Sequence, residues 1–334
     1  MFQDKRILIT GAAGSVGSEL VKTFLKQGAI VCAFDNDENG LFALDQMLSP
    51  AYSKNLRLFL GDVRDEMRVS KAFEGIDLVF HCAALKHVYL SEYNPFEAMQ
   101  TNIYGTNNVI NAAIKSRVKK VIYTSSDKAV NPSSTMGASK LLGERLIAAA
   151  NHHSGGNITK FCSVRFGNVL NTRGSVLQIF NQQILHNLPI TITSKNMTRF
   201  FLSMDQAVEL CIYACKNVIG GEIFVKNMGS CNILSLAKAI SPDTNNFEFI
   251  GLKSGEKLYE ELVTEIEAER TYYKDSWYMI VPDTMDHMNV KQAQLYKKLI
   301  NKLPKIKSSL RSDKELMTDK MVYKMLLEFG LITK

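Results

Sequence analysis

No apolar run in this chain of 334 residues reaches the roughly eighteen residues that span a bilayer, and no signal-peptide pattern is visible. The six cysteines lie mostly within apolar stretches. Cys211 and Cys215 are spaced i, i+4 on an expected helix, but no His or Cys partner pattern follows, so we interpret them as buried small side chains. These absences predict a cytoplasmic protein with no metal site and no membrane contact.

Nucleic-acid motifs are also missing, although the chain is basic. The 40 basic and 33 acidic residues give a net charge of +7, and much of the excess comes from scattered lysines in the last fifty residues, without interleaved aromatics. We interpret these lysines as a solvated surface and expect no nucleic-acid partner. With 46% hydrophobic and 22% charged residues, and no internal repeat, the chain has the composition of an ordinary globular protein.

Expected strands alternate with amphipathic helices from the first residues to about Val169. Such alternation predicts right-handed βαβ crossovers and an α/β fold, a doubly wound parallel sheet of the Rossmann type. The expected strands are Arg6–Thr10, Ala29–Phe34, Leu56–Leu60, Leu78–Cys82, Val118–Thr124 and Phe161–Phe166, and the longer expected helices are Ser15–Gln27, Phe96–Ser116 and Met136–Asn151.

Beyond Val169 the alternation fades, which predicts a smaller and discontinuous substrate-binding lobe. We divide the chain into a dinucleotide-binding domain at 1–169, with returning segments from about 200–225, a substrate lobe at 170–283, and a Lys-rich helical extension at 284–334. Ser312 and Glu315 have the spacing of a capping box for a last helix that ends near Gly330. The apolar stripe of that helix comprises Leu316, Met321, Val322, Met325, Leu326 and Phe329.

A glycine-rich turn follows the first strand and opens the first helix. Glycines at 11, 14 and 17 allow a tight turn and a close approach of a pyrophosphate to the backbone. The helix then presents free N–H groups and its positive dipole end to the phosphates. This pattern predicts a dinucleotide site built by Gly11, Gly14, Ser15, Val16 and Gly17.

Asp35 ends the second strand, where a carboxylate would bind the adenosine ribose hydroxyls. It would repel a ribose phosphate, and no arginine lies nearby in sequence, so we expect NAD rather than NADP. The alternative is that Asp35 only caps the turn that follows it. Asp62-Val63 and Ala83-Ala84 come after the next two strands, at the sheet edge where such folds bind ligands.

A catalytic tyrosine is missing from its expected place. A short-chain dehydrogenase carries Tyr-x-x-x-Lys, but here the residue four before Lys140 is Met136. A thioether neither gives nor accepts a proton, so other groups must move the protons if the chain is a redox enzyme. Asp127 and Lys128, directly after a central strand, are the candidates, although a surface ion pair is the alternative.

Seven short motifs occur in order between Phe2 and about Val281. They resemble the extended short-chain dehydrogenase/reductases, and within them the bacterial 4,6-dehydratases of nucleotide-activated N-acetylglucosamine, the polysaccharide-biosynthesis type. Some members of that branch carry methionine in place of the tyrosine. The motifs are Ala84-Leu85-Lys86-His87-Val88, Ser126-Asp127-Lys128-Ala129-Val130, Met136-Gly137-Ala138-Ser139-Lys140, Arg165-Phe166-Gly167-Asn168-Val169, Gly174-Ser175-Val176, Met197-Thr198-Arg199-Phe200 and Gly255-Glu256-Lys257.

The resemblance implies an NAD-dependent lyase of bacterial surface-glycan or nonulosonic acid biosynthesis. Hydride would leave sugar carbon 4, water would be lost from carbons 5 and 6, and hydride would return to carbon 6. Asp127 would be the acid for the departing hydroxyl and Lys128 the base at carbon 5. Ser126 would bind the 4-hydroxyl, whose proton goes to Asp127 or through the ribose, and Lys140 would hold that ribose. Lys86 and Asn102 complete the expected cofactor contacts.

For the substrate, the resemblance points to a nucleotide sugar, with UDP favoured over GDP and retention favoured over inversion at carbon 5. Lys253 stands where relatives usually have arginine. A nucleotide-sugar 4-epimerase and a catalytically silent NAD sensor remain as alternatives, and analogy suggests a homodimer or larger homo-oligomer. The expected substrate contacts are Lys86, His87, Met136, Asn168, Ser175, Val176, Arg199, Lys253 and Glu256.

Overall fold

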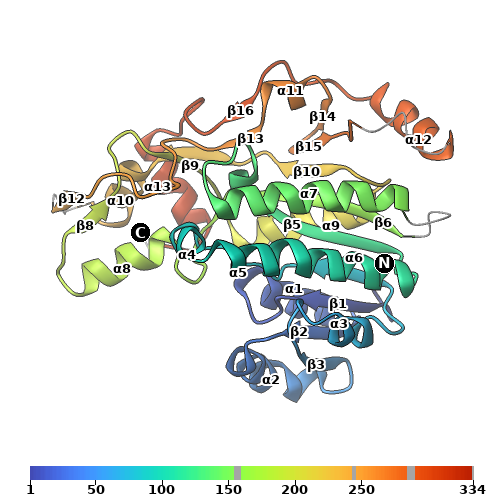
Figure 1. Ribbon diagram of the computed structural model, residues 1–334. Coiled ribbons are helices and arrows are strands. Elements are labelled where there is room, and N and C mark those ends of the chain that lie inside the picture. The colour runs from blue at the N-terminus through green and yellow to red at the C-terminus, as the bar shows by residue number, and fades with distance from the viewer. Residues whose placement is uncertain (154–158, 243–245, 284–289, 333–334) are drawn as a thin grey trace.

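A nine-stranded sheet forms the centre of the computed structural model, which describes residues 1–153, 159–242, 246–283 and 290–332 (Figure 1). The strand order is β14-β15-β10-β6-β5-β4-β1-β2-β3, and all strands from β10 to β3 run parallel. The strands are β1 (Arg6–Thr10), β2 (Ile30–Asp35), β3 (Leu56–Leu60), β4 (Leu78–His81), β5 (Lys120–Ser126), β6 (Lys160–Phe166), β10 (Ile223–Lys226), β14 (Thr271–Lys274) and β15 (Trp277–Ile280). The predicted doubly wound parallel sheet is therefore confirmed.

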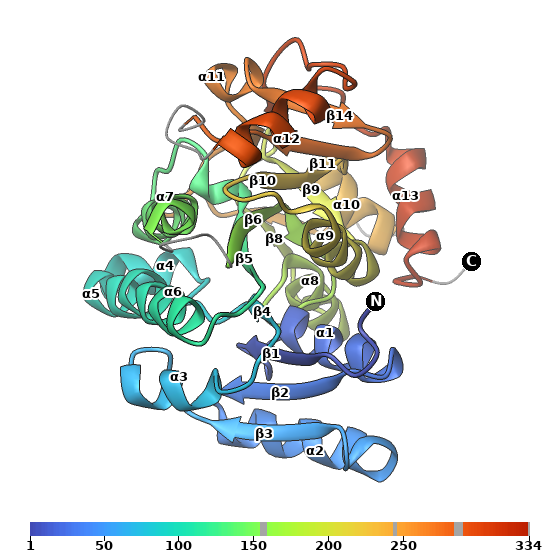
Figure 2. The same ribbon diagram turned by 90° about the vertical axis from the view of Figure 1, so that its right-hand side faces the viewer.

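Helices cover both faces of this sheet (Figure 2). One face packs against α1 (Ser15–Lys26), α2 (Glu38–Tyr52) and α9 (Met204–Asn217). The other face packs against α3 (Glu66–Ala72), α6 (Gly105–Lys115) and α7 (Thr135–His153). The central strands β1 and β4 are almost completely buried because helices lie on both sides of them.

The long helix expected at 96–116 has an irregular middle. Its first part is α5 (Pro95–Met99), a π-helical turn spans Gln100–Tyr104, and α6 continues to Lys115. A π-turn inserts one residue into the helical repeat and turns the side chains beyond it to a new face. The other elements predicted in the first 169 residues agree with the structure to within two residues at each end.

A smaller lobe lies at the carboxyl edge of the sheet. Its core joins α8 (Val176–Leu185), α10 (Ile233–Ile240) and α13 (Asp319–Glu328). The lobe's short strands are β7 (Asn168–Val169), β8 (Ile190–Ile192), β9 (Thr198–Leu202), β11 (Gly229–Asn232), β12 (Phe247–Phe249), β13 (Glu261–Val263) and β16 (Leu310–Arg311). Of the remaining helices, α4 (Val88–Tyr93) lies next to α7, and α11 (Glu265–Ala268) and α12 (Val290–Ile300) pack on the core of the main sheet.

The prediction of a helix capped by Ser312 and Glu315 is wrong. The helix α13 begins at Asp319, and Thr318 caps it by accepting a hydrogen bond from the Met321 N–H. The Ser312 hydroxyl is buried and accepts from the Glu260 N–H at 2.9 Å, so it is not free to cap a helix. Within the predicted stripe Val322, Met325 and Leu326 are buried, whereas Leu316 and Met321 are exposed.

A buried charged cluster ties the two parts of the molecule together. The guanidinium of Arg165 on β6 makes two hydrogen bonds to Glu144 on α7 and two to Glu267 on α11, at 2.7 to 2.9 Å. It also donates to the Leu262 carbonyl on β13. Burial raises the pKa of Glu267, but the hydrogen bonds and charge of Arg165 outweigh that effect, and the net pKa lies below its usual range. The cluster therefore holds α7 against the segment that carries β13.

Candidate active site

Three adjoining cavities run along the carboxyl edge of the parallel sheet. The first has a volume of about 310 Å³ and extends from the glycine-rich turn to Asp62. The second, about 620 Å³, contains Ser126, Met136 and Lys140 and shares Gly11 and Gly14 with the first. The third, about 300 Å³, lies between the smaller lobe and the segments at Val88 and Ser133-Ser134, and it meets the second at Lys128 and Asn168. One groove thus connects a site at the sheet edge to a site in the smaller lobe.

The glycine-rich turn has the close packing that a dinucleotide cradle needs. Gly11 has φ +68°, and a Cβ there would lie 2.6 Å from the Ala83 nitrogen. A Cβ at Gly17 would lie 2.0 Å from the Gly11 oxygen, so glycine is required for α1 to approach β1. No side chain caps α1 and no acidic residue occupies its first turn, so its N–H groups can receive an anion.

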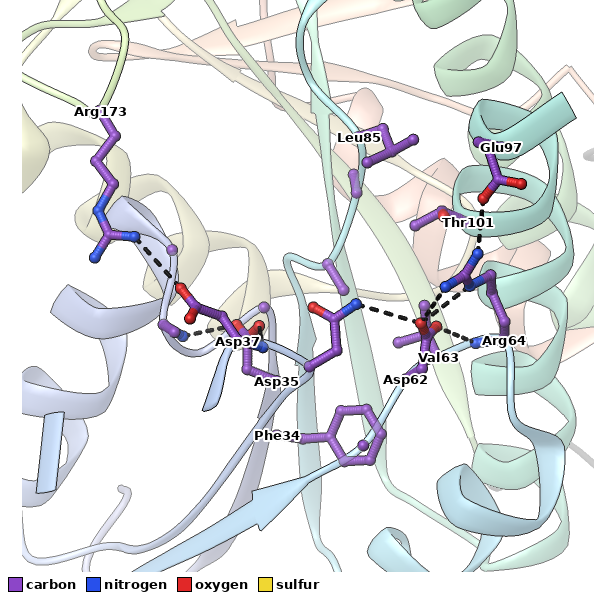
Figure 3. Close-up of a pocket in the computed structure, with 17 residues that line it drawn as sticks. Phe34, Asp35, Asp37, Asp62, Val63, Arg64, Leu85, Glu97, Thr101 and Arg173 are labelled. Carbon is purple, nitrogen blue, oxygen red and sulfur yellow. Dashed lines mark hydrogen bonds and ion pairs between the residues drawn. The ribbon is translucent and has the colours of Figure 1, made fainter. Parts of the chain in front are cut away.

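Carboxylates and arginines surround the far end of the first cavity (Figure 3). Asp35 accepts hydrogen bonds from the Ala13 N–H at 2.8 Å and the Asp37 N–H at 3.0 Å, so it does cap the turn, and it also lines the cavity. Asp62 pairs with Arg64 at 2.7 Å. Burial opposes ionisation of Asp62, but hydrogen bonds from Arg64 lower its pKa overall. Both carboxylates are therefore held in place as acceptors.

A buried polar network shapes the wall behind the groove. His81 is fully buried between the hydroxyls of Thr10, at 2.7 Å, and Thr106, at 3.0 Å. Burial, aided by the charge of Lys140, lowers the pKa of His81 to about 3, so the ring is neutral. Asn102, in the π-helical turn, exchanges hydrogen bonds with the Leu85 backbone and donates to the Ser139 hydroxyl. Asn102 thus positions the loop after β4 and does not line a cavity.

Ser126, Asp127 and Lys128 form one hydrogen-bonded unit at the end of β5. The Ser126 hydroxyl and the Lys128 ammonium each donate to Asp127 Oδ1 at 2.9 Å. Asp127 is fully buried, its Oδ2 has no hydrogen-bond partner among the described residues, and it does not line a cavity. Lys128 is 22% exposed and lines both the second and the third cavity. The alternative of a surface ion pair is therefore wrong.

Lys128 also faces the smaller lobe. Its ammonium donates to the Asn168 side-chain oxygen at 3.2 Å and lies 3.9 Å from Glu260 Oε1. Glu260 is buried and contacts Lys257 at 3.3 Å and Arg199 at 3.9 Å. Two buried carboxylates, one from each part of the molecule, thus flank a single lysine.

Met136 and Lys140 lie on the same cavity, on adjacent turns of α7. Met136 is 3% exposed and belongs to the lining of the second cavity. Lys140 donates to the Thr124 carbonyl at 2.8 Å and lies over the Tyr123 ring. Burial lowers the pKa of Lys140 to about 8. The lysine of the Tyr-x-x-x-Lys pattern is therefore in place, whereas the side chain one turn before it has no proton to transfer.

The third cavity has a basic lining. Arg199 and Lys257 line it together with Lys253 and Glu256 of the loop before β13. The Arg199 guanidinium is nevertheless occupied, because it donates to the carbonyls of Thr198, Lys257 and Leu258. These hydrogen bonds hold the loop before β13, so the guanidinium is not free to bind an anion through two parallel hydrogen bonds. Ser175 and Val176, at the start of α8, open onto the groove; the Ser175 N–H donates to the Thr172 carbonyl at 2.9 Å, so it is the first turn of α8 from Val176 on that offers N–H groups.

All predicted site residues except Asn102 and Asp127 line one of the three cavities. The sequence interpretation missed six charged residues that line the groove: Asp37, Arg64, Glu97, Arg173, Lys257 and Glu260. Lys257 and Glu260 had a usable signal, because they belong to or closely follow the Gly-Glu-Lys motif. Within the described residues no group of three or more His, Cys, Asp and Glu could hold a metal ion, and no helix is long and apolar enough to cross a membrane.

Residues 7–282 match a family model described as polysaccharide biosynthesis protein. An uncharacterized membrane protein of Methanocaldococcus jannaschii is 45% identical over 85% of this chain and 88% of its own length. A UDP-N-acetylglucosamine 4,6-dehydratase (inverting) of Campylobacter jejuni is 40% identical over 84% of both chains. A UDP-glucose 4-epimerase of Rickettsia rickettsii is also 40% identical, over 86% of this chain and 85% of its own.

Two solved structures are similar to this chain over different shares of its length. The X-ray structure of Pen from Bacillus thuringiensis covers 100% of both chains at 37% identity with a TM-score of 0.90. The UDP-glucose 4-epimerase of Thermus thermophilus, in complex with NAD, covers 75% of this chain and 88% of its own at 23% identity with a TM-score of 0.65, which shows a common fold. Because the family model covers 7–282, this chain belongs to the family of polysaccharide biosynthesis proteins.

Proposed function

We propose that this chain is an NAD-dependent 4,6-dehydratase of a nucleotide-activated N-acetylglucosamine. The observation that carries the proposal is the Ser126-Asp127-Lys128 unit, which shares the second cavity with Lys140 and lies where that cavity meets the third. A dehydratase needs two proton-transfer groups besides a hydride carrier, and this unit supplies both. The dehydratase of C. jejuni supports the same assignment.

The first cavity fits NAD. The glycine cradle and the uncapped start of α1 would hold the diphosphate, and Asp35 would accept from the adenosine ribose. When bound, NAD supplies a hydride acceptor that is regenerated within each turnover. Lys140, which lines the second cavity, would hold the nicotinamide ribose.

Ser126 and Asp127 would remove the proton of the sugar 4-hydroxyl. Ser126 lines the cavity and donates to Asp127 Oδ1, so its hydroxyl can pass a proton inward when it accepts one from the sugar. Asp127, which is fully buried, would then hold that proton as a carboxylic acid. It can return the proton through the same hydroxyl to the hydroxide that leaves carbon 6 as water.

Lys128 would remove the proton from carbon 5. This step requires the neutral amine, so the Lys128 ammonium would first lose a proton to water in the cavity that it lines, while Asp127, 2.9 Å away, holds the proton of the sugar hydroxyl. After water has left and hydride has returned to carbon 6, Lys128 gives a proton back to carbon 5. Each group therefore accepts one proton and releases one, and the cycle closes. Return by the same group fits retention at carbon 5, the outcome we favour over the inversion named for the C. jejuni relative.

The third cavity would bind the nucleoside diphosphate. Lys253 and Lys257 supply positive charge there, and the first turn of α8, from Val176 on, offers N–H groups to the diphosphate. Lys86 and His87, which line the second cavity, would contact the substrate on its cofactor side. We favour UDP because the named dehydratase relative acts on UDP-N-acetylglucosamine.

A second function, 4-epimerisation, is favoured by the R. rickettsii relative. Incubation of the purified protein with UDP-N-acetylglucosamine, and in parallel with the GDP sugar, followed by NMR separates the functions. The proposal predicts a 4-keto-6-deoxy sugar. An axial 4-hydroxyl would instead identify an epimerase, and no turnover with either sugar would favour an NAD sensor.

Replacement of Met136 by leucine is expected to leave kcat within about threefold of the original value. The two side chains have similar volume, and the proposed chemistry makes no use of the sulfur. Steady-state rates with the nucleotide sugar measure this, with NADH binding as the control for a correctly formed site. A loss of a hundredfold or more would show that the thioether takes part in the reaction.

We also infer that the protein forms a homo-oligomer through α5, α6 and α7. These helices lie side by side on one face of the molecule in Figure 1, with no other element in front of them. Phe96 on α5, Tyr104 in the π-helical turn and Leu142 on α7 are 60%, 53% and 50% exposed. Large apolar side chains exposed on neighbouring helices are typical of an interface between subunits.

A further inference from the structure

One short segment of the smaller lobe crosses over the glycine-rich turn. This strap, residues 170–174, follows β7 and precedes α8. Its start is fixed, because Leu170 is buried and its N–H donates to the Leu202 carbonyl on β9. Its path is a tight turn with positive φ at Asn171 and Gly174, +58° and +69°. The strap therefore has a defined conformation that begins at a fixed point.

Arg173, near the end of the strap, contacts three segments of the domain that carries the glycine-rich turn. Its N–H donates to the Ser15 hydroxyl at 3.2 Å, at the first residue of α1. Its carbonyl accepts from the Lys86 ammonium at 2.7 Å, after β4. Its guanidinium lies 3.6 Å from Asp37, which caps α2 (Figure 3). Arg173 also lines both the first and the second cavity, so it stands over the passage that joins them.

The contact between Arg173 and Asp37 is weak enough to be exchanged. The two side chains are 67% and 43% exposed, and such a pair contributes little in water. Lys86 lies close by, and burial together with the charge of Arg173 lowers its pKa, as expected where cations gather. Lys86, Arg173 and the N-terminus of α1 together place positive charge around the glycine-rich turn. A diphosphate group bound there would be attracted by all three.

We propose that Arg173 is a cofactor-binding residue that clamps the dinucleotide diphosphate under the strap and thereby slows its release. The backbone ties to Ser15 and Lys86 hold the strap in place, and the guanidinium supplies the charge that binds the anion. Slow release suits a reaction in which the cofactor is regenerated at every turnover and need not leave. The proposal concerns NAD alone, so it does not depend on the identity of the sugar.

The test is the rate of NADH release, measured without any sugar. The protein is loaded with NADH and mixed with excess NAD, and the decay of NADH fluorescence is followed by stopped flow. Arg173→Ala should release NADH at least about tenfold faster, the usual size of one lost charge-assisted contact. Arg173→Lys keeps the charge but loses the planar guanidinium that can donate two parallel hydrogen bonds. Its rate of NADH release should lie between the rates of the original protein and of Arg173→Ala.

The matched control is Arg145→Ala. Arg145 is 57% exposed and pairs with Asp283 at 3.2 Å, but it lies outside all three cavities. It should release NADH at the original rate, and all variants should unfold at the same temperature without cofactor. Release from Arg173→Ala within twofold of the original rate would overturn the proposal, as would equal acceleration in Arg145→Ala.

Discussion

Lys128→Arg is expected to reduce dehydration by about a thousandfold or more while NADH still binds. Arginine keeps the positive charge beside the buried Asp127, so the ion pair and the local fold survive. It cannot lose its proton under ordinary conditions, so it cannot remove the proton from carbon 5. A general base typically contributes a factor of about 10²–10⁴, and the loss should appear in kcat rather than in KM.

Lys119 provides a matched control for Lys128. It pairs with Asp77 at 2.7 Å, but it is 60% exposed and lies outside the groove, so Lys119→Arg should leave kcat unchanged. Lys128→Met should also abolish turnover, and circular dichroism would report whether the unpaired Asp127 disturbs the fold. If Lys128→Arg turned over at more than a tenth of the original rate, Lys128 would not be the base.

Arg165→Met is expected to destabilise the protein by about 3–5 kcal/mol, the usual cost of removing one partner from a buried ion pair. The substitution would leave the carboxylates of Glu144 and Glu267 buried side by side without their common cation. It should also lower activity, because α7 carries Lys140 and β13 directly follows Glu260. Urea unfolding followed by circular dichroism measures the change in free energy.

A triple variant separates lost charge balance from lost packing. Glu144→Gln and Glu267→Gln, added to Arg165→Met, remove the unpaired charges and should recover part of the stability. Arg311→Met serves as the control, because Arg311 pairs with Asp313 at the surface and should have little effect. A change below about 1 kcal/mol for Arg165→Met would contradict the role given to this cluster.

Local patterns predicted the fold of the parallel-sheet part of the molecule well. The glycine turn, Asp35 and the motif after β5 depend on residues close together in sequence, and they meet at the carboxyl edge of one sheet. The same local logic failed at Ser312, which has the spacing of a capping box. There a tertiary contact, the hydrogen bond from the Glu260 N–H, takes the hydroxyl that a helix cap would need.

Residues that reach the site from distant segments could not be predicted in the same way. Arg173 contacts Ser15 across 158 positions of sequence, and no spacing rule connects the two. Glu260 approaches Lys128 only because β13 and the turn after β5 pack together. The sequence also did not reveal that Asp127 is screened from the cavity, because a carboxylate next to a lysine is compatible with a surface pair as well.

The most direct test of the proposed function follows one deuterium atom. UDP-N-acetylglucosamine labelled with deuterium at carbon 4 is incubated with the purified protein, and the product is analysed by NMR and mass spectrometry. Dehydration with internal return of the hydride predicts a 4-keto product that carries the deuterium in its carbon 6 methyl group. Deuterium retained at carbon 4 in a product with an inverted hydroxyl would contradict the account.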